Sequence, residues 1–126
     1  MSEFSGKVVI VTGSSSGIGE AIALRLGELG ASVVVNSANS VEAGKAVAAK
    51  IGANAFYVQA DISDKDAGQH LLDETIKRFG KLDILINNAG WTSLVAHHDL
   101  EALTDEIFQK TFEVNVWCTW ALTKAA

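Results

Sequence analysis

The sequence has one cysteine, no long apolar run, and fewer cationic than anionic side chains. Cys118 alone cannot form an intramolecular disulfide, which excludes a disulfide-stapled secreted domain and favours the cytoplasm. No stretch approaches the roughly 18 apolar residues of a membrane span, and the residues from Met1 to Lys7 lack a signal peptide's charged and apolar regions, so we predict neither. The net charge of −5 opposes binding to nucleic acid or to an anionic membrane. Histidine and cysteine form no cluster with metal-ligand spacing, so no metal site is predicted.

Proline is absent as well, although an average composition would supply about six in a chain of this length. The 11 glycines, by contrast, are concentrated, and three of them lie within the stretch 13–19. Hydrophobic residues make up 48% of the chain and charged residues 20%, which excludes intrinsic disorder. With 126 residues, we expect one ordered domain with an ordinary hydrophobic core.

Short apolar runs rich in β-branched residues alternate with segments whose apolar residues recur at helical spacing. The runs are typical of strands that are buried on both faces, and we expect strands at 8–11, 33–35, 55–58 and 83–86. The other segments predict helices over 18–29, 40–51, 63–79 and from Thr104 to the end of the sequence. This alternation predicts an α/β fold, with a parallel sheet covered by helices on both faces.

Some helix ends and inward faces can be predicted more closely. Ser63 and Asp66 have the spacing of a capping box, which predicts Ser63 as the N-cap of the third helix. Thr104 is the predicted N-cap of the last helix, because two acidic residues follow it. Cys118 in that helix is interpreted as a small buried apolar residue. In the first helix Ile18, Ile22, Leu26 and Leu29 recur at helical spacing. The residues of the third helix expected to face the core are Leu72, Ile76 and Phe79.

The glycine-rich stretch 13–19 lies between the first expected strand and the first expected helix. A loop in this position can direct backbone N–H groups and the positive end of the helix at a phosphate. We expect Gly13 to permit a tight turn, Gly17 to remove a Cβ where a pyrophosphate would approach, and Gly19 to allow close packing of helix and strand. The serines at 14–16 would add hydroxyl donors. The alternative is a structural turn that happens to be glycine-rich.

The spacing Thr-Gly-x-x-x-Gly-x-Gly at 12–19, together with Asn-Asn-Ala-Gly at 87–90, resembles the short-chain dehydrogenase/reductase family. The resemblance runs from about Gly6 to the last residue. It implies a Rossmann-like, doubly wound parallel sheet, of which 1–126 would be the N-terminal part, with strand order 3-2-1-4 and an end inside the helix after the fourth strand. It also implies hydride transfer between a nicotinamide cofactor and a small alcohol or carbonyl compound, and a homo-oligomer.

The resemblance implies binding roles for residues in three segments. Asp61 also lies after the third expected strand, where ligands bind in open α/β sheets, although a plain turn aspartate is the alternative. The residues implied to hold the cofactor pyrophosphate are Gly13, Ser15, Ser16, Gly17, Ile18 and Gly19. Those implied to line the ribose are Asn88, Ala89 and Gly90, and those implied to contact the adenine are Asp61 and Ile62.

Asn115 is implied to belong to the catalytic centre. Asparagine is a poor residue inside a helix, because its side chain competes for backbone hydrogen bonds, so its place between Val114 and Val116 invites a functional reason. The implied role is to bend the helix and to hold a water molecule of a proton relay. The alternative is a solvated helix asparagine.

The end of the second expected strand bears on the choice of cofactor. A carboxylate there would accept the ribose hydroxyls of NAD and repel a 2′-phosphate, but the chain has Asn36 and Ser37 in this place. We therefore favour NADP, with NAD as the alternative because the segment 36–40 contains no arginine. Ser37→Arg is expected to favour NADP and Asn36→Asp to favour NAD.

The family's catalytic serine, tyrosine and lysine are not found in this sequence. Tyr57 is the single tyrosine and has Asp61 four residues later, whereas Trp120 precedes Lys124 at the right spacing but has no ionisable hydroxyl. The three residues would lie beyond Ala126. The leading interpretation is thus part of an NAD(P)-dependent oxidoreductase, and the alternatives are a non-catalytic dinucleotide-binding module and an inactive fragment.

A chain with these bounds is expected to self-associate. The fourth strand would have an open edge, and apolar residues of the last helix would lack a covering partner. Sedimentation at low micromolar concentration would test this expectation, which a compact monomer would contradict. The apolar residues concerned are Phe112, Val116, Trp117 and Trp120.

Overall fold

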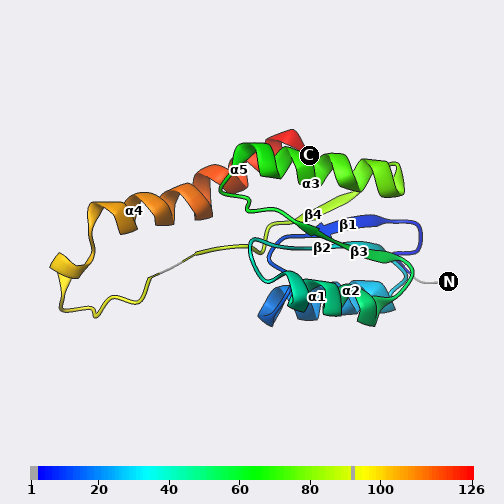
Figure 1. Ribbon diagram of the computed structural model, residues 1–126, viewed down its shortest axis with the longest axis horizontal. Helices are drawn as coiled ribbons and strands as arrows, with labels where there is room; N and C mark the ends of the chain where they lie inside the picture. The colour runs from blue at the N-terminus through cyan, green and yellow to red at the C-terminus, as the bar shows by residue number, and fades with distance from the viewer. Residues whose placement is uncertain (1–2, 92) are drawn as a thin grey trace.

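The computed structural model describes residues 3–91 and 93–126, and a parallel sheet lies at its centre (Figure 1). The strands are β1 (Val8–Val11), β2 (Ser32–Ser37), β3 (Ala55–Gln59) and β4 (Ile84–Ile86). They are ordered β3-β2-β1-β4, and each neighbouring pair is parallel. The structure confirms the Rossmann-like α/β sheet and its predicted strand order.

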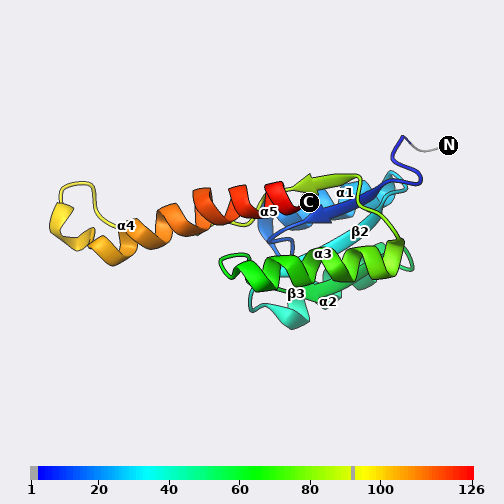
Figure 2. The same ribbon diagram turned by 90° about the horizontal axis from the view of Figure 1, so that it is seen from above.

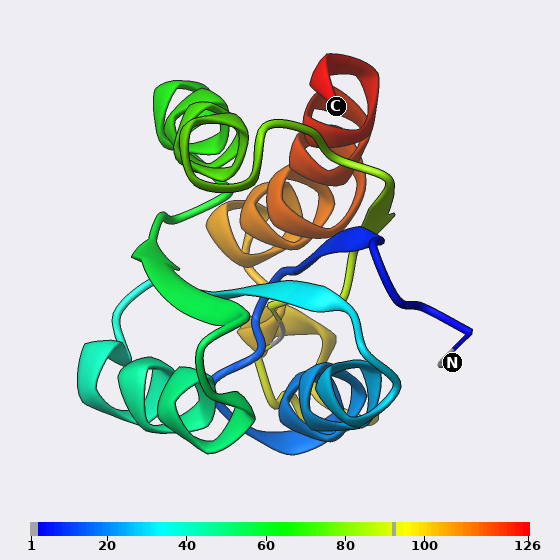
Figure 3. The same cartoon turned by 90° about the vertical axis from the view of Figure 1, so that its right-hand side faces the viewer.

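Helices cover both faces of this sheet. Figure 3 shows α1 (Gly17–Glu28) and α2 (Val41–Ile51) on one face and α3 (Lys65–Phe79) and α5 (Thr119–Ala125) on the other. A single turn of 3₁₀ helix, η1 (Leu100–Ala102), precedes the last helical region. No helix in the described part of the chain is long and apolar enough to cross a membrane.

The last helical region forms one rod that extends well past the sheet (Figures 1 and 2). It begins with α4 (Asp105–Phe112), continues through the π-helical segment η2 (Glu113–Cys118), and ends in α5. Thr104 is the N-cap of α4, as predicted, and its side chain accepts a hydrogen bond from the backbone N–H of Ile107. Cys118 is buried, as predicted, and its burial raises the pKa of the thiol.

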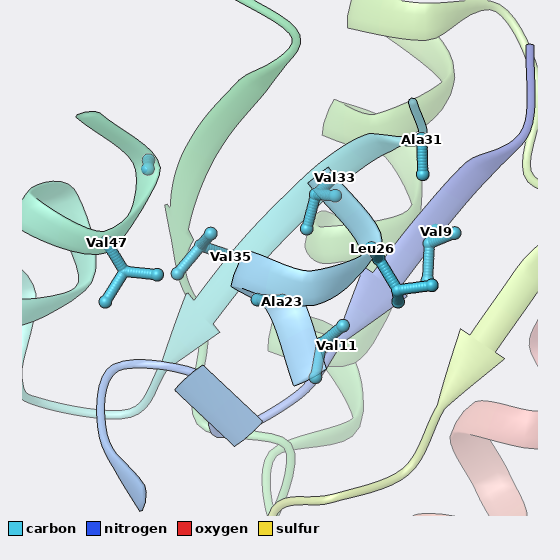
Figure 4. Packing of buried hydrophobic residues seen from close by; sticks show 9 residues of the cluster. Val9, Val11, Ala23, Leu26, Ala31, Val33, Val35 and Val47 are labelled. Carbon is cyan, nitrogen blue, oxygen red and sulfur yellow. The ribbon is translucent and has the colours of Figure 1, made fainter. Parts of the chain in front are cut away.

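The core lies on both sides of β1, whose residues 8–11 are all buried. Successive strand side chains point to opposite faces, so Val9 and Val11 pack toward α1 and α2 whereas Ile10 packs toward α3 and α5. Figure 4 shows the first of these clusters, and its buried members are Val9, Val11, Ala23, Leu26, Ala31, Val33, Val35, Val47 and Ala48. Burial on both faces explains why these strands lack polar alternation.

Two sequence-based expectations about helices are wrong, those for Ser63 and Ile76. The N-cap of α3 is Asp64, whose side chain accepts a hydrogen bond from the N–H of Asp66 at 2.9 Å, because the Ser63 hydroxyl is bonded to Asp61 instead. Ile76 is 48% exposed, and Leu71 of α3 is buried in its place. Ile18 is 75% exposed, because it lies at the very start of α1, beyond the part of the helix that covers the sheet.

The features behind the expected self-association are present. Among the described residues, β4 pairs with β1 alone, so its other edge is open. The exposed apolar side chains of the last helical region are Phe108, Phe112, Val116, Trp117 and Trp120. Self-association itself stays a prediction.

Candidate functional site

The glycine-rich loop lies at the edge of the sheet where the parallel strands end. Val11 in β1 is level with Val35 in β2 and with Ile86 in β4. The segments that follow these three strands therefore leave the sheet side by side. This is the edge at which open α/β sheets bind ligands.

Two glycines give the loop its course. Gly13 and Gly17 have φ angles of +62° and +59°, a region that residues with a Cβ rarely adopt. A Cβ on Gly13 would also lie 2.9 Å from the Cα of Ala89, whereas a Cβ on Gly17 would meet no atom within 4 Å. Gly19 is the first buried residue of α1, and a Cβ there would collide with the carbonyl of Gly13 and the side chain of Asn88. The tight turn expected at Gly13 is confirmed, and Gly19 packs against this loop and Asn88.

Thr12 fastens the end of β4 to this loop, a role that the sequence analysis missed. Its buried hydroxyl accepts hydrogen bonds from the backbone N–H groups of Asn88 at 3.1 Å and Ala89 at 3.0 Å. The side-chain amide of Asn88 in turn donates to the Gly13 carbonyl at 3.0 Å. The predicted ribose-lining residues are thereby held beside the loop.

Asn36 joins the loop to β2 and β3. Its Oδ1 accepts from the Gly13 N–H at 3.2 Å, and its Nδ2 donates to the carbonyls of Val58 and Ala60 at 3.1 and 3.0 Å. A carboxylate here would place an oxygen against both carbonyls, so Asn36→Asp would destabilise the fold and does not cleanly test cofactor choice.

Two serines are also engaged inside the protein. Ser14 is buried, and its hydroxyl donates to the Val11 carbonyl at 2.7 Å and accepts from the Asn36 N–H at 3.0 Å. It is therefore not the free donor that the sequence suggested. Ser37 is 5% exposed, and its hydroxyl lies 2.6 Å from that of Tyr57.

Two adjoining pockets open along this edge. We call the first the loop pocket, because it surrounds the glycine-rich loop and the start of α2. Its lining residues are Gly13, Ser15, Ser16, Ile18, Ser37, Ala38, Asn39, Ser40, Asn88, Ala89 and Gly90. Ser40 is the N-cap of α2, yet its side chain makes no capping hydrogen bond. Its hydroxyl is therefore not committed to the helix and can serve a ligand.

The second pocket, here called the Asp61 pocket, shares the residues Gly13, Ala38, Asn39, Ala89 and Gly90 with the first. Its other lining residues are Asn36, Ala60, Asp61, Ile62, Ser63, Trp91, Lys110 and Val114. The Oδ1 of Asp61 accepts from the N–H and the hydroxyl of Ser63, at 3.0 and 2.6 Å. The side chain of Ile62 is buried in the second core cluster.

Asn115 lies behind this pocket, in the π-helical segment η2. Its Oδ1 accepts from the Trp91 N–H at 2.9 Å, and its Nδ2 donates to the Trp91 carbonyl at 2.7 Å. A Cβ on Gly90 would lie 2.9 Å from the same Oδ1. The side chain that the sequence analysis placed at the catalytic centre thus fixes the segment after β4, at a π-helical turn of the kind that often marks functional sites.

The structure therefore gathers most of the predicted binding residues around two joined pockets. Gly17 and Gly19 shape the loop without lining either pocket, and Asn115 acts from behind Trp91. Backbone N–H groups, free serine hydroxyls and the start of the 12-residue α1 suit the phosphates of an extended ligand. Among residues 3–91 and 93–126, no group of three or more His, Cys, Asp or Glu could hold a metal ion.

Asp83 serves the sheet rather than the pockets. Its Oδ2 accepts from the Val8 N–H at 2.8 Å and lies 3.0 Å from the Lys81 ammonium. The hydrogen bond from Val8, followed by that from Lys81, lowers the pKa of the Asp83 carboxyl. The sequence predicts a fourth strand that begins at Asp83, but β4 begins one residue later, at Ile84.

The lowered pKa of Asp83 predicts a loss of stability in acid. A carboxyl whose pKa is lower in the folded than in the unfolded state stabilises the fold above its unfolded pKa, and this contribution disappears as pH falls through the folded pKa. We expect the urea concentration at the unfolding midpoint of the wild type to decrease as the pH is lowered from about 5 to about 3. For Asp83→Asn this decrease should be less steep. Equal slopes for the two proteins would contradict this role of Asp83.

Comparison with known proteins gives consistent matches. The family model for short chain dehydrogenases matches residues 7–126. The chain is 48% identical over 113 residues to versicolorin reductase 1 of Aspergillus parasiticus, which covers 87% of this chain and 42% of that protein. It is 43% identical over 117 residues to elsinochrome reductase 1 of Elsinoe fawcettii, which covers 90% of this chain and 43% of that protein.

A solved structure agrees with these matches. The crystal structure of 3-ketoacyl-(acyl-carrier-protein) reductase from Brucella melitensis, complexed with NADH, superposes with a TM-score of 0.89 at 35% identity. The match covers 98% of this chain and 49% of that one. The chain spans about half the length of the curated relatives it matches, or slightly less. The family match, the sheet order and the loop geometry agree, and this chain belongs to the short-chain dehydrogenase family.

Proposed function

We propose that this chain is the cofactor-binding part of an NAD(P)-dependent oxidoreductase that acts on a small alcohol or carbonyl compound. The main support for the proposal is the pair of adjoining pockets around the glycine-rich loop, at the edge of the sheet where the strands end. Gly13 and Gly17 of this loop have left-handed backbone conformations. The names of its relatives support it, because versicolorin reductase 1 and elsinochrome reductase 1 are reductases. The similar Brucella melitensis structure contains NADH.

The lining residues suit the parts of a dinucleotide. The loop pocket, with Ser15, Ser16 and the backbone at 13–19, would hold the pyrophosphate, and residues 88–90 would line a ribose. Asp61 can accept from the adenine amino group, because the hydrogen bonds of the described residues use its Oδ1 and leave Oδ2 available. A bound nicotinamide dinucleotide supplies or accepts the hydride. Asn115 keeps residues 90 and 91 in place beside it.

NADP is the preferred cofactor in this proposal. Among the described residues no carboxylate lines the loop pocket, so no negative side chain of theirs repels a 2′-phosphate there. The uncommitted hydroxyl of Ser40, the amide of Asn39 and the N-terminus of α2 can donate to it. Ser37 is a less suitable ligand through its hydroxyl, which pairs with Tyr57.

A charge change at Ser40 tests this preference. Asp and Asn cap helices about equally well, so Ser40→Asp and Ser40→Asn keep α2 intact and differ in charge and in the amide donor that Asn adds. We expect Ser40→Asp to weaken NADPH binding about tenfold relative to Ser40→Asn, with NADH binding nearly unchanged, because like charges repel. Titration followed by nicotinamide fluorescence measures both constants. Equal losses for the two cofactors would move the 2′-phosphate away from α2.

The function itself is tested by binding and turnover. The 126-residue chain is expected to bind NADPH or NADH weakly and to give no change in nicotinamide absorbance with any alcohol or carbonyl compound, because it lacks the family's tyrosine and lysine pair. The full-length protein should give both binding and turnover. Failure of both proteins to bind a dinucleotide would overturn the proposal, and binding without turnover by the full-length protein would favour the non-catalytic module.

We further propose a cytoplasmic homo-oligomer. The single cysteine, which is buried, fits a reducing compartment. The exposed aromatic residues of the last helical region, among them Trp117 and Trp120, fit a surface that another subunit covers. Fractionation and sedimentation of the full-length protein test these two points.

A further inference from the structure

We propose that Lys110 supplies the positive charge that draws the phosphates of the dinucleotide into this site. The inference rests on the proposed function and adds a residue from α4, a helix to which the sequence analysis assigned no binding role. Lys110 lines the Asp61 pocket together with Trp91 and Val114. Its position joins the helical rod to the cofactor site.

Lys110 is the positively charged residue among those that line the two pockets. The loop pocket is lined by neutral residues, and the Asp61 pocket has one carboxylate, Asp61, and one ammonium, Lys110. A nicotinamide dinucleotide brings at least two negative phosphate charges to these pockets. Hydroxyls and backbone dipoles can solvate those charges, but among the lining residues Lys110 is the full positive charge that can offset them.

The ammonium of Lys110 contacts the ring of a residue that lines the Asp61 pocket, and forms no ion pair with another described residue. Glu106 and Glu113 are its neighbours at helical spacing, yet among the described residues no carboxylate lies within 4 Å of its ammonium. The ammonium instead lies 4.3 Å from the centre of the Trp91 ring. An aromatic face attracts a cation without neutralising it, so the charge of Lys110 still attracts the phosphates in the adjoining loop pocket.

The platform beneath Lys110 is itself fixed. Both backbone groups of Trp91 are hydrogen-bonded to the Asn115 side chain, at 2.9 and 2.7 Å. Asn115 and Lys110 belong to the same helical rod, five positions apart in sequence. In this helical rod Asn115 therefore holds the backbone of Trp91, and Lys110 contacts the Trp91 ring. The two contacts together restrict the position of the Lys110 ammonium.

The experiment compares the dissociation constants of NADPH and NADH in the full-length wild type, Lys110→Gln and Lys110→Arg. Lys45→Gln is the matched control, because it changes the net charge equally on the exposed surface of α2 and lines neither pocket. We expect Lys110→Gln to raise the constant about fivefold at low ionic strength, and more for NADPH than for NADH. The loss of affinity should be smaller in 0.5 M salt, because the Debye length there is only about 4 Å and the charges are screened. Lys110→Arg should bind like the wild type.

A double-mutant cycle tests the platform. In a Trp91→Leu background, Lys110→Gln is expected to cost less affinity than in the wild type, because the ammonium no longer has its aromatic support. If the wild type binds and Lys110→Gln behaves like Lys45→Gln, the inference is overturned while the proposed function stands. If the wild type binds no dinucleotide, the proposed function fails and the inference fails with it.

Discussion

Gly17→Ala is expected to lower dinucleotide affinity at least tenfold, while Gly80→Ala leaves it unchanged. Both glycines have positive φ, +59° and +81°, and a Cβ on either would meet no protein atom within 4 Å. The two alanine variants therefore carry a similar backbone penalty of about 1 kcal/mol in the free energy of unfolding. They differ in position alone, because Gly17 begins α1 beside the loop pocket whereas Gly80 ends α3.

This matched pair separates strain from obstruction. Urea unfolding measures the backbone strain, and titration with NADPH measures the obstruction of the ligand by the added Cβ. Gly17→Val would be a poorer variant, because a β-branched residue at positive φ is strongly strained and would disturb the fold itself. Unchanged NADPH affinity in Gly17→Ala would return the glycine cluster to the alternative of a structural turn.

Thr12→Val is expected to destabilise the protein by about 2 kcal/mol or more, although valine has almost the same shape. The change removes the oxygen that accepts from the N–H groups of Asn88 and Ala89, and leaves two donors without this partner. Thr12→Ser keeps the oxygen and loses a methyl group. It should cost about 1 kcal/mol, the value of one buried methyl group.

The test depends on which of the two variants, Thr12→Val or Thr12→Ser, has the lower free energy of unfolding. If packing dominated, Thr12→Ser would be the more damaging change; if the hydrogen bonds dominate, Thr12→Val is. Urea unfolding monitored by tryptophan fluorescence gives both free energies. We also expect Thr12→Val to weaken NADPH binding, because residues 88–90 would no longer be held against the loop. Equal stability of Thr12→Val and wild type would contradict the role given to this hydroxyl.

The helix ends show where local sequence is a sufficient guide. Thr104 caps α4 as predicted, because the interaction joins residues three apart and nothing distant competes. Ser63 does not cap α3, because its hydroxyl donates a hydrogen bond to the nearby carboxylate of Asp61. This competing interaction is also short-range. Asp64 then provides the cap. Two adjacent capping residues give the sequence two solutions, and the contacts around them choose one.

The last helical region shows the opposite case. The resemblance to a family implied a bend at Asn115, and the structure has a π-helical segment there. The side chain of Asn115 in this segment is hydrogen-bonded to the backbone of Trp91, 24 positions away. The ammonium of Lys110 lies over the ring of the same Trp91, 19 positions away in sequence. No spacing within the helix could have indicated either.

The sequence by itself determined the α/β class and the tight turn of the glycine-rich loop, whereas the order of the strands was implied by the resemblance to a family. The class and the turn depend on hydrophobic periodicity and on left-handed glycines such as Gly13, both of which are local. The strand order depends on pairings such as that of β1 with β4, which lie far apart in the sequence. The tertiary structure alone decided which polar groups are spent inside the protein, as in Asn36 and Ser14, and which are free to meet a ligand, as in Ser40. The physical reason is that a buried polar group must find a partner wherever the folded chain supplies one, and such partners come from strands far apart in the sequence.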